Sequence, residues 1–225
     1  MLELKDTVKL FYGKYLYKVD LNLPHGHYFR NKNLDYARKA LDHMQDQAVE
    51  HGKITEPFVY SSLSRSIEIN SFNNLKKLYS ILKNSKNYTI RIEGTIVSIY
   101  SNNYNLINEL LGTFPKRALN VYKPKDESHK RLLLSDENVL FIKNESKWNY
   151  KLTLRIDDVR KYEEFIHYCE GKDFCSVPGA VSTFSWHRSS QRTLYIKDKK
   201  SLNLLYLFDG FGVQSIHRLI CKKDG

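Results

Sequence analysis

The sequence predicts an α+β protein, because strand-like and helix-like segments follow one another in an order that occurs twice. Between residues 148 and 220, apolar residues first alternate with polar ones and then recur at helical spacing. This succession gives the order strand, helix, strand, strand, helix, strand. Residues 14–93 give the same order, so we expect a duplicated unit.

The first strand and helix of the later unit have the clearest pattern. At residues 150–156, Tyr, Leu, Leu and Ile alternate with Lys, Thr and Arg. A period of two is typical of a strand that is buried on one face only. We expect Asp157 or Asp158 to cap the next helix, whose apolar residues recur from Val159 to Cys169.

The rest of the later unit is predicted as a hairpin, a helix and a final strand. Residues 180–187 and 194–197 are rich in β-branched and aromatic side chains and flank a polar turn. Asp198 is placed to cap a helix that runs to residue 208, and residues 213–220 form the last strand. A βαββαβ order is that of the ferredoxin-like fold, a mainly antiparallel sheet with both helices on one face.

The earlier unit is predicted from its likeness to the later one. Residues 14–23 parallel residues 147–156, and a helix is expected at residues 34–49. A short strand is expected at residues 58–62, and the segments that follow are predicted as strand, helix and strand, at residues 66–70, 72–82 and 88–92.

The domain organisation expected from these patterns is two tandem ferredoxin-like units with a connection between them. Before each unit we expect a hairpin, in which residues 5–12 pair with 15–23 and residues 139–143 pair with 148–156. The three regions are a first unit with its hairpin, a connecting strand, helix and strand with a basic segment, and a second unit, at residues 1–93, 94–147 and 148–225.

Composition favours a folded protein with an anionic partner. The 225 residues are 41% hydrophobic and 27% charged, and the net charge is +11. This positive excess favours nucleic acid as the partner. No apolar run reaches the roughly 18 residues that cross a membrane, and the N-terminus lacks the apolar stretch of a signal peptide. We therefore expect a cytoplasmic protein that does not bind membranes.

Motifs of cofactor and metal chemistry are absent from the sequence. There is no glycine-rich phosphate loop, no zinc-ligand spacing and no nuclease-type carboxylate cluster. The three cysteines form no CxxC pair, so we interpret them as buried thiols. The sequence therefore predicts no cofactor and no metal.

Two regions carry the cations that could hold nucleic acid. The first is a proline-punctuated basic segment, residues 115–131, in which Asp126 and Glu127 partly offset the charge. The second is the open face of the later sheet, where cations and aromatic rings would hold phosphates and stack on bases. The residues predicted to bind nucleic acid are Lys116, Arg117, Lys123, Lys125, Lys130, Arg131, Lys151, Arg155, Trp186, Arg188, Arg192, Tyr195 and Lys197.

The placement of the aromatic rings depends on which face of the third strand is covered. If Phe184, Trp186 and Arg188 lie on the open face, the rings are available for stacking. In the opposite register these rings belong to the core, and Thr183 and His187 face outward together with Ser185. The sequence leaves both registers open.

One loop favours an enzyme instead. His25 and His27 follow a predicted strand, and residues two apart on an extended chain point to the same side. The pair could ligate a metal ion or act as a general base near a scissile phosphate. It also resembles the two-histidine motif of rolling-circle replication endonucleases, although Gly26 stands where that family has a hydrophobic residue. The resemblance implies a DNA-nicking activity.

The leading hypothesis is a non-enzymatic protein that binds single-stranded or structured nucleic acid, with RNA preferred to DNA. The alternative is a metal-independent ribonuclease or nicking endonuclease that uses His25 and His27. A third hypothesis is a protein-interaction module that docks a protein partner at an exposed sheet edge. High Lys, Asn and Tyr content is also typical of viral or phage accessory proteins, which would act in the host cytoplasm. The oligomeric state is not predicted.

Overall fold

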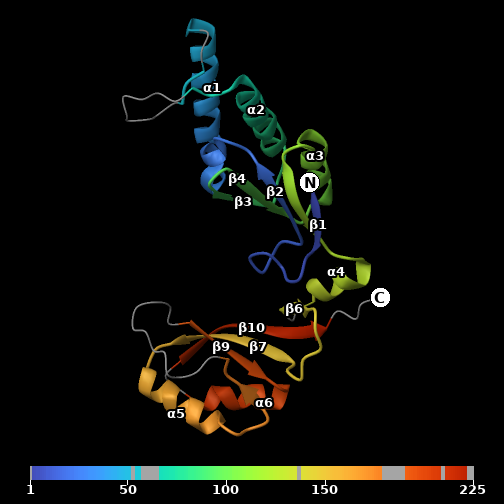
Figure 1. Cartoon of the computed structure of the whole chain (residues 1–225), viewed down its shortest axis with the longest axis vertical. Coiled ribbons are helices and arrows are strands. Elements are labelled where there is room, and N and C mark those ends of the chain that lie inside the picture. The colour runs from blue at the N-terminus through green and yellow to red at the C-terminus, as the bar shows by residue number, and fades with distance from the viewer. Residues whose placement is uncertain are drawn as a thin grey trace. The chain divides into compact units, whose positions relative to one another are not determined.

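The computed structural model describes residues 2–51, 54–56, 66–135, 138–178, 191–208 and 211–221. The chain divides into two compact units, residues 1–130 and 131–225. Each unit contains one five-stranded mixed sheet with helices on one of its faces (Figure 1). The α+β class predicted from the sequence is therefore confirmed.

The first unit is built on a sheet with the strand order β1-β5-β2-β4-β3. Strand β1 is parallel to β5, and the other neighbouring pairs are antiparallel. The strands are β1 (Glu3–Asp6), β2 (Tyr17–Asn22), β3 (Tyr88–Glu93), β4 (Ile96–Ser101) and β5 (Ala118–Lys123). The helices are η1 (Gly26–Lys32), α1 (Leu34–His51), α2 (Ile69–Lys83) and α3 (Tyr104–Thr113).

The second unit is built on a sheet with the strand order β6-β10-β7-β9-β8. Strand β6 is parallel to β10, and the other neighbouring pairs are antiparallel. The strands are β6 (Val139–Ile142), β7 (Tyr150–Ile156), β8 (Cys175–Ser176), β9 (Gln191–Ile196) and β10 (Phe211–Cys221). The helices are α5 (Val159–Cys169), α6 (Lys199–Leu204) and η2 (Leu205–Leu207), while α4 (Glu127–Leu133) spans the boundary between the units.

The two sheets share one arrangement. In each, the first strand of the unit lies parallel to the fifth, and the fifth, second, fourth and third strands follow as antiparallel neighbours. The order is not the clean βαββαβ pattern that the sequence predicted. Each sheet has an extra edge strand, and three helices, η1, α1 and α2, separate the second and third strands of the first unit.

The predicted hairpins at residues 5–12 and 139–143 are wrong. Glu3 of β1 pairs with Asn120 of β5, and Val139 of β6 pairs with Arg218 of β10. In both sheets the last strand of the unit lies between the first and the second strand. The turn after β1 does form, but it closes only a single bridge between Phe11 and Tyr15.

The predicted strand at residues 66–70 is also wrong. Ser66 makes an isolated bridge to Thr55, and helix α2 already begins at Ile69. Residues 94–147, predicted to connect two units, instead contribute β4, α3 and β5 to the first unit and β6 to the second. The third and fourth strands of the first unit are therefore β3 and β4, which lie later in the chain than the strand predicted at residues 66–70.

The helices of the second unit follow the sequence pattern closely. Asp158 caps α5 by accepting hydrogen bonds from the backbone N–H groups of Arg160 and Lys161. Asp198 caps α6 by accepting the N–H of Ser201 at 2.7 Å. The strands predicted at residues 58–62 and 180–187 lie outside the described residues.

Each unit has its own hydrophobic core between its sheet and its helices. In the first, Val19 and Leu21 of β2 pack with apolar residues of α1, α2 and α3. In the second, Leu152 and Leu154 of β7 pack with Phe165 of α5 and with both buried cysteines, Cys169 and Cys175. Among the described residues, no helix is long and apolar enough to span a membrane.

Candidate nucleic-acid interface

The open face of the second sheet is defined by the alternation of β7. Leu152 and Leu154 are fully buried on the face that α5 and α6 cover. Lys151, Thr153 and Arg155 alternate with them and therefore lie on the opposite face. This is the distribution that the sequence predicted for this strand.

Three rows of residues run across this face from β9 through β7 to β10, and the first two have polar side chains on all three strands. Lys151 pairs with Tyr195 on one side and with His217 on the other. The next row on the same face joins Thr153 to Thr193 and Ser215. Directly opposed side chains in a sheet have Cβ atoms about 5 Å apart, so each row is contiguous.

Arg155 occupies the third row, and its guanidinium group is accessible. Its side chain is 58% exposed, and its Nε donates a hydrogen bond to Asp157 Oδ1 at 2.8 Å. The Asp157 carboxylate raises the pKa of Arg155, which therefore stays charged. Gly212 lies opposite Arg155 on β10, and a Cβ there would make ordinary contacts with Asp157 Oδ2 at 3.4 Å and Arg155 Nη2 at 3.9 Å.

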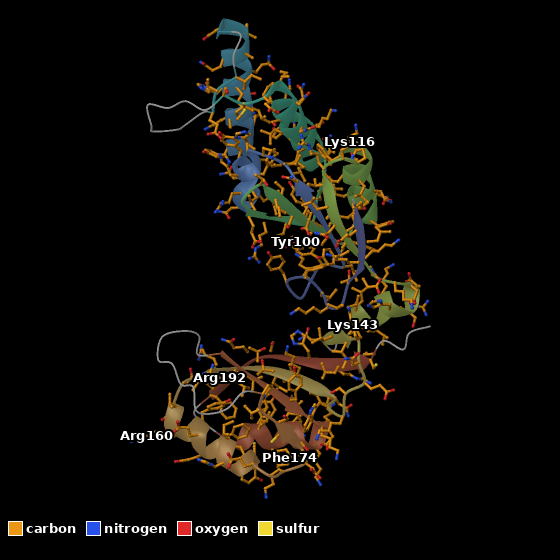
Figure 2. All side chains as sticks on the ribbon, in the orientation of Figure 1. Tyr100, Lys116, Lys143, Arg160, Phe174 and Arg192 are labelled. Atoms are coloured by element: carbon orange, nitrogen blue, oxygen red, sulfur yellow. The ribbon has the colours of Figure 1, made fainter. Side chains whose placement is uncertain are left out.

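The other predicted residues of this sheet are placed differently. Arg192 lies opposite Leu154, on the helix-covered face, where its charge acts on the Tyr162 hydroxyl (Figure 2). Lys197 is exposed and follows the end of β9. Trp186 and Arg188 lie outside the described residues. The face described here therefore contains Lys151, Arg155 and Tyr195 from the prediction, and His217 in addition.

The basic segment does not form one linker. Lys116 and Arg117 lie in the turn before β5, and Lys123 ends the strand (Figure 2). Six extended residues span roughly 20 Å, so β5 separates the first two cations from Lys123 and Lys125. Lys130 and Arg131 belong to helix α4.

Helix α4 gives part of the basic segment a structural role. Asp126 Oδ1 accepts the backbone N–H of His129 at 2.7 Å, which caps the helix. The buried His129 accepts the N–H of Lys125 through Nδ1, and Lys130 Nζ forms an ion pair with Glu127 at 3.3 Å. Lys125 and Lys130 were predicted to lie in a loop. In the structure these contacts hold them at or within helix α4.

The two histidines of the first unit lie close together. His25 follows β2, and its Nδ1 is 2.5 Å from Glu56 Oε1. His27 is exposed, and the centres of the two imidazole rings are 6.5 Å apart. Glu56 was not singled out from the sequence, because it lies 31 residues away with no motif to connect it to His25.

The open face of the first sheet contains an aromatic cluster that the sequence analysis missed. Lys18 Nζ lies 4.9 Å from the ring centre of Tyr122 and 5.7 Å from that of Tyr100 (Figure 2). Phe11 contacts both tyrosine rings, and Tyr12 contacts Tyr100. The cluster was missed because β4 and β5 were not assigned to the first unit.

Comparisons with protein-family models, with curated proteins and with solved structures find no match. Among the residues described by the structure, no group of three or more His, Cys, Asp and Glu side chains could hold a metal ion.

Proposed function

We propose that the chain is a nucleic-acid-binding protein that holds single-stranded or structured RNA on the open face of its second sheet. The observation that supports this best is the row formed by Tyr195, Lys151 and His217 on three neighbouring strands. A phenol ring can stack on a base, and a neighbouring ammonium group can pair with the adjoining phosphate.

The rows beside it supply complementary groups. Thr153, Thr193 and Ser215 offer hydroxyls that donate to phosphate or ribose oxygens. Arg155 keeps exposed guanidinium N–H groups beyond those that contact Asp157, and guanidinium binds phosphate in bidentate geometry. Single-stranded nucleic acid is the partner that needs both the ring and the cations.

The fold proposal that accompanies this function is a ferredoxin-like core in each unit. The fifth, second, fourth and third strands of each sheet have the order of that fold, and the first strand is an added edge. The shared order supports an internal duplication. The function itself is argued from side chains, because one fold serves many functions.

The experiment is a titration of fluorescent single-stranded RNA, single-stranded DNA and duplex DNA with the protein at several salt concentrations. We expect the tightest binding for single-stranded RNA. In a plot of the logarithm of the binding constant against the logarithm of the salt concentration, the slope should be negative. Each phosphate contact should contribute about 0.7 to the magnitude of this slope. Replacing both Lys151 and Arg155 by Ala should reduce this slope by about 1.4 and weaken binding at least about tenfold.

The matched control is Arg91→Ala on the first sheet. Arg91 is an exposed cation paired with Glu93, much as Arg155 is paired with Asp157. We expect its replacement to change the affinity less than twofold. Equal losses for both sheets, or an unchanged affinity in the double variant, would contradict the proposed interface.

A second candidate function is docking of a protein partner at the edge of β10. Strand β6 pairs with residues 218–221 only, and no other described strand pairs with residues 211–217 at that edge. A hollow of about 510 Å³ beside it is lined mainly by apolar residues of η2 and β10. Binding of this kind would be insensitive to salt, which separates it from the first proposal.

A further inference from the structure

The histidine loop of the first unit is held in a constrained conformation. His25 has φ 62° and ψ 14°, in the left-handed region that non-glycine residues seldom adopt. Gly26 is packed so closely on β4 that a Cβ would overlap the Val97 side chain. The chain therefore places His25 and His27 on either side of a fixed glycine. Such strain persists where the surrounding structure enforces it, and it is concentrated at functional sites.

Glu56 fixes the orientation of the first histidine. Its Oε1 lies 2.5 Å from His25 Nδ1, and the two side chains are only 11% and 22% exposed. A carboxylate at Nδ1 fixes the orientation of the imidazole and leaves Nε2 as the ring nitrogen available to another group. Segment 54–56 is anchored in turn, because Ile54 accepts the backbone N–H of Ile67 at 2.8 Å.

The second histidine lies in a different electrostatic environment. One side of its ring packs on Tyr28, with ring centres 4.1 Å apart. Desolvation of the packed side of this otherwise exposed ring lowers the pKa of His27; the charges of His25 and Arg30 act in the same direction, and Glu56 opposes them. The lowered pKa favours the uncharged form of this imidazole, which can accept a proton.

Tyr28 adds a polar group directly beside the pair. The residue is only 2% exposed, and its hydroxyl has no hydrogen-bond partner among the described residues. Burial raises the pKa of Tyr28, with smaller contributions from Glu56 and Tyr36. The phenol therefore remains a neutral donor next to His27.

These groups match the requirements of phosphodiester cleavage in RNA. Ring centres 6.5 Å apart allow one phosphodiester to lie between a proton acceptor and a proton donor. An acid–base pair of this kind can act on a nucleophile that the substrate itself supplies. The 2′-hydroxyl of RNA is such a nucleophile, and DNA lacks it.

We propose that His25 and His27 form an acid–base pair that cleaves RNA by transfer of the phosphodiester to the neighbouring 2′-hydroxyl. His27 removes the 2′-hydroxyl proton while the 2′-oxygen forms a bond to phosphorus. The bond from phosphorus to the 5′-oxygen breaks, and protonated His25 donates its Nε2 proton to that leaving oxygen. The products are a 2′,3′-cyclic phosphate and a 5′-hydroxyl, and no other reactant is consumed.

The remaining groups have supporting roles in this step. Glu56 is a positioning residue, because it contacts His25 and not the substrate. Arg30 is exposed and lies close enough to His27 to affect its charge, so it can pair with the phosphate. The choice of RNA as substrate rests on the proposed function, whereas the acid–base geometry does not.

The test is cleavage of 5′-labelled single-stranded RNA by the purified full chain in buffer containing a metal chelator. We expect cleavage with a cyclic phosphate end, detected by mass spectrometry, and no cleavage of the same oligonucleotide with 2′-deoxyribose throughout. His25→Ala and His27→Ala should each lower the rate at least about 100-fold. Glu56→Gln should lower it less and shift the pH dependence of the rate, which a purely structural contact would not do.

The matched control is His167→Ala in the second unit. His167 Nδ1 lies 3.1 Å from Glu170 Oε2, so it forms the same kind of pair, but on an exposed helix surface. Its replacement should leave the rate unchanged. Circular dichroism of every variant shows whether it is folded. If an alanine variant unfolds, His27→Gln and His25→Asn keep a polar side chain that can form hydrogen bonds and remove the acid–base function.

The outcomes separate this inference from the proposed function. Wild-type protein that binds RNA in salt-sensitive fashion without cutting it would overturn the inference and leave the binding function intact. Equal cleavage of RNA and of the 2′-deoxy strand, or cleavage that survives both histidine substitutions, would also overturn it. Cleavage that is lost with His27 but is unaffected by Lys151→Ala and Arg155→Ala would support the inference and count against the interface on the second sheet.

Discussion

The two sheets have the same strand order, yet their open faces are chemically opposite. Strands β2 and β7 are the central strands of their sheets, and both alternate apolar and polar residues. The polar residues of β2 are Lys18, Asp20 and Asn22. At the corresponding positions β7 has Lys151, Thr153 and Arg155. Two changes of residue type thus make the second face more positive by two charges.

On the first sheet the polar groups satisfy one another. Asp20 is 5% exposed, pairs with Lys18 at 3.0 Å, and accepts hydrogen bonds from Ser98 and Asn120. The segment after β1 adds Phe11 and its neighbouring tyrosine on top of this network. On the second sheet, Thr153 offers Lys151 no counter-charge. The same strand order therefore places Lys18 within a network of polar contacts in the first unit and leaves Lys151 without a carboxylate neighbour on its strand in the second.

The largest expected effect comes from breaking the network of the first sheet. Asp20→Thr gives β2 the residue that β7 has, and it leaves the Lys18 ammonium group without its carboxylate. We expect the free energy of unfolding to fall by about 2–3 kcal/mol, because removing one partner of a largely buried pair leaves an uncompensated charge. Urea unfolding followed by circular dichroism measures the change.

The double variant Lys18→Met, Asp20→Thr is the control for this prediction. Removing both charges should restore most of the lost stability, since apolar replacement of a buried pair is often neutral. A single variant as stable as the wild type would show that Asp20 is not needed to hold Lys18.

A smaller effect is expected from the reverse substitution in the second sheet. Thr153→Asp places a carboxylate two residues from Lys151 on the same face and opposite Ser215, as Asp20 lies beside Lys18. We expect affinity for single-stranded RNA to fall about tenfold, because the carboxylate pairs with the cation and repels phosphate. Thr153→Ala removes the hydroxyl without adding charge and should lose much less. Equal losses in both variants would assign the effect to the hydroxyl instead.

The sequence predicted correctly where the decisive interactions are local. The alternation in β7 identified the buried Leu152 and Leu154 and the opposite open face. The caps at Asp158 and Asp198 were identified too, because a cap binds backbone groups only two or three residues away. Period and capping are properties of short segments, so a single sequence contains them.

The errors lie where pairing is between distant residues. The pairing of Glu3 with Asn120, and of Val139 with Arg218, places the last strand beside the first. A turn such as the one closed by Phe11 and Tyr15 suggests a hairpin, but a sheet can insert another strand there. The contact of His25 with Glu56 has the same character. No local pattern encodes such contacts, because the whole sheet determines them.

The smallest effect concerns the helix between the fourth and fifth strands of each unit. In the second unit Asp198 caps α6, and the backbone hydrogen bond from Ser201 lowers the pKa of its carboxyl group. In the first unit Asn103 caps α3 through its side-chain oxygen and does not titrate. Because the folded state favours charged Asp198, its stabilisation is present above the ordinary aspartate pKa and is lost as the pH falls through the lowered value.

Asp198→Ala should therefore lower the urea midpoint at neutral pH, and the difference from wild type should vanish in acid. Asn103→Ala should cost the same stability at both pH values. A pH-independent loss for Asp198→Ala would show that the cap acts through its hydrogen bond alone and not through its charge.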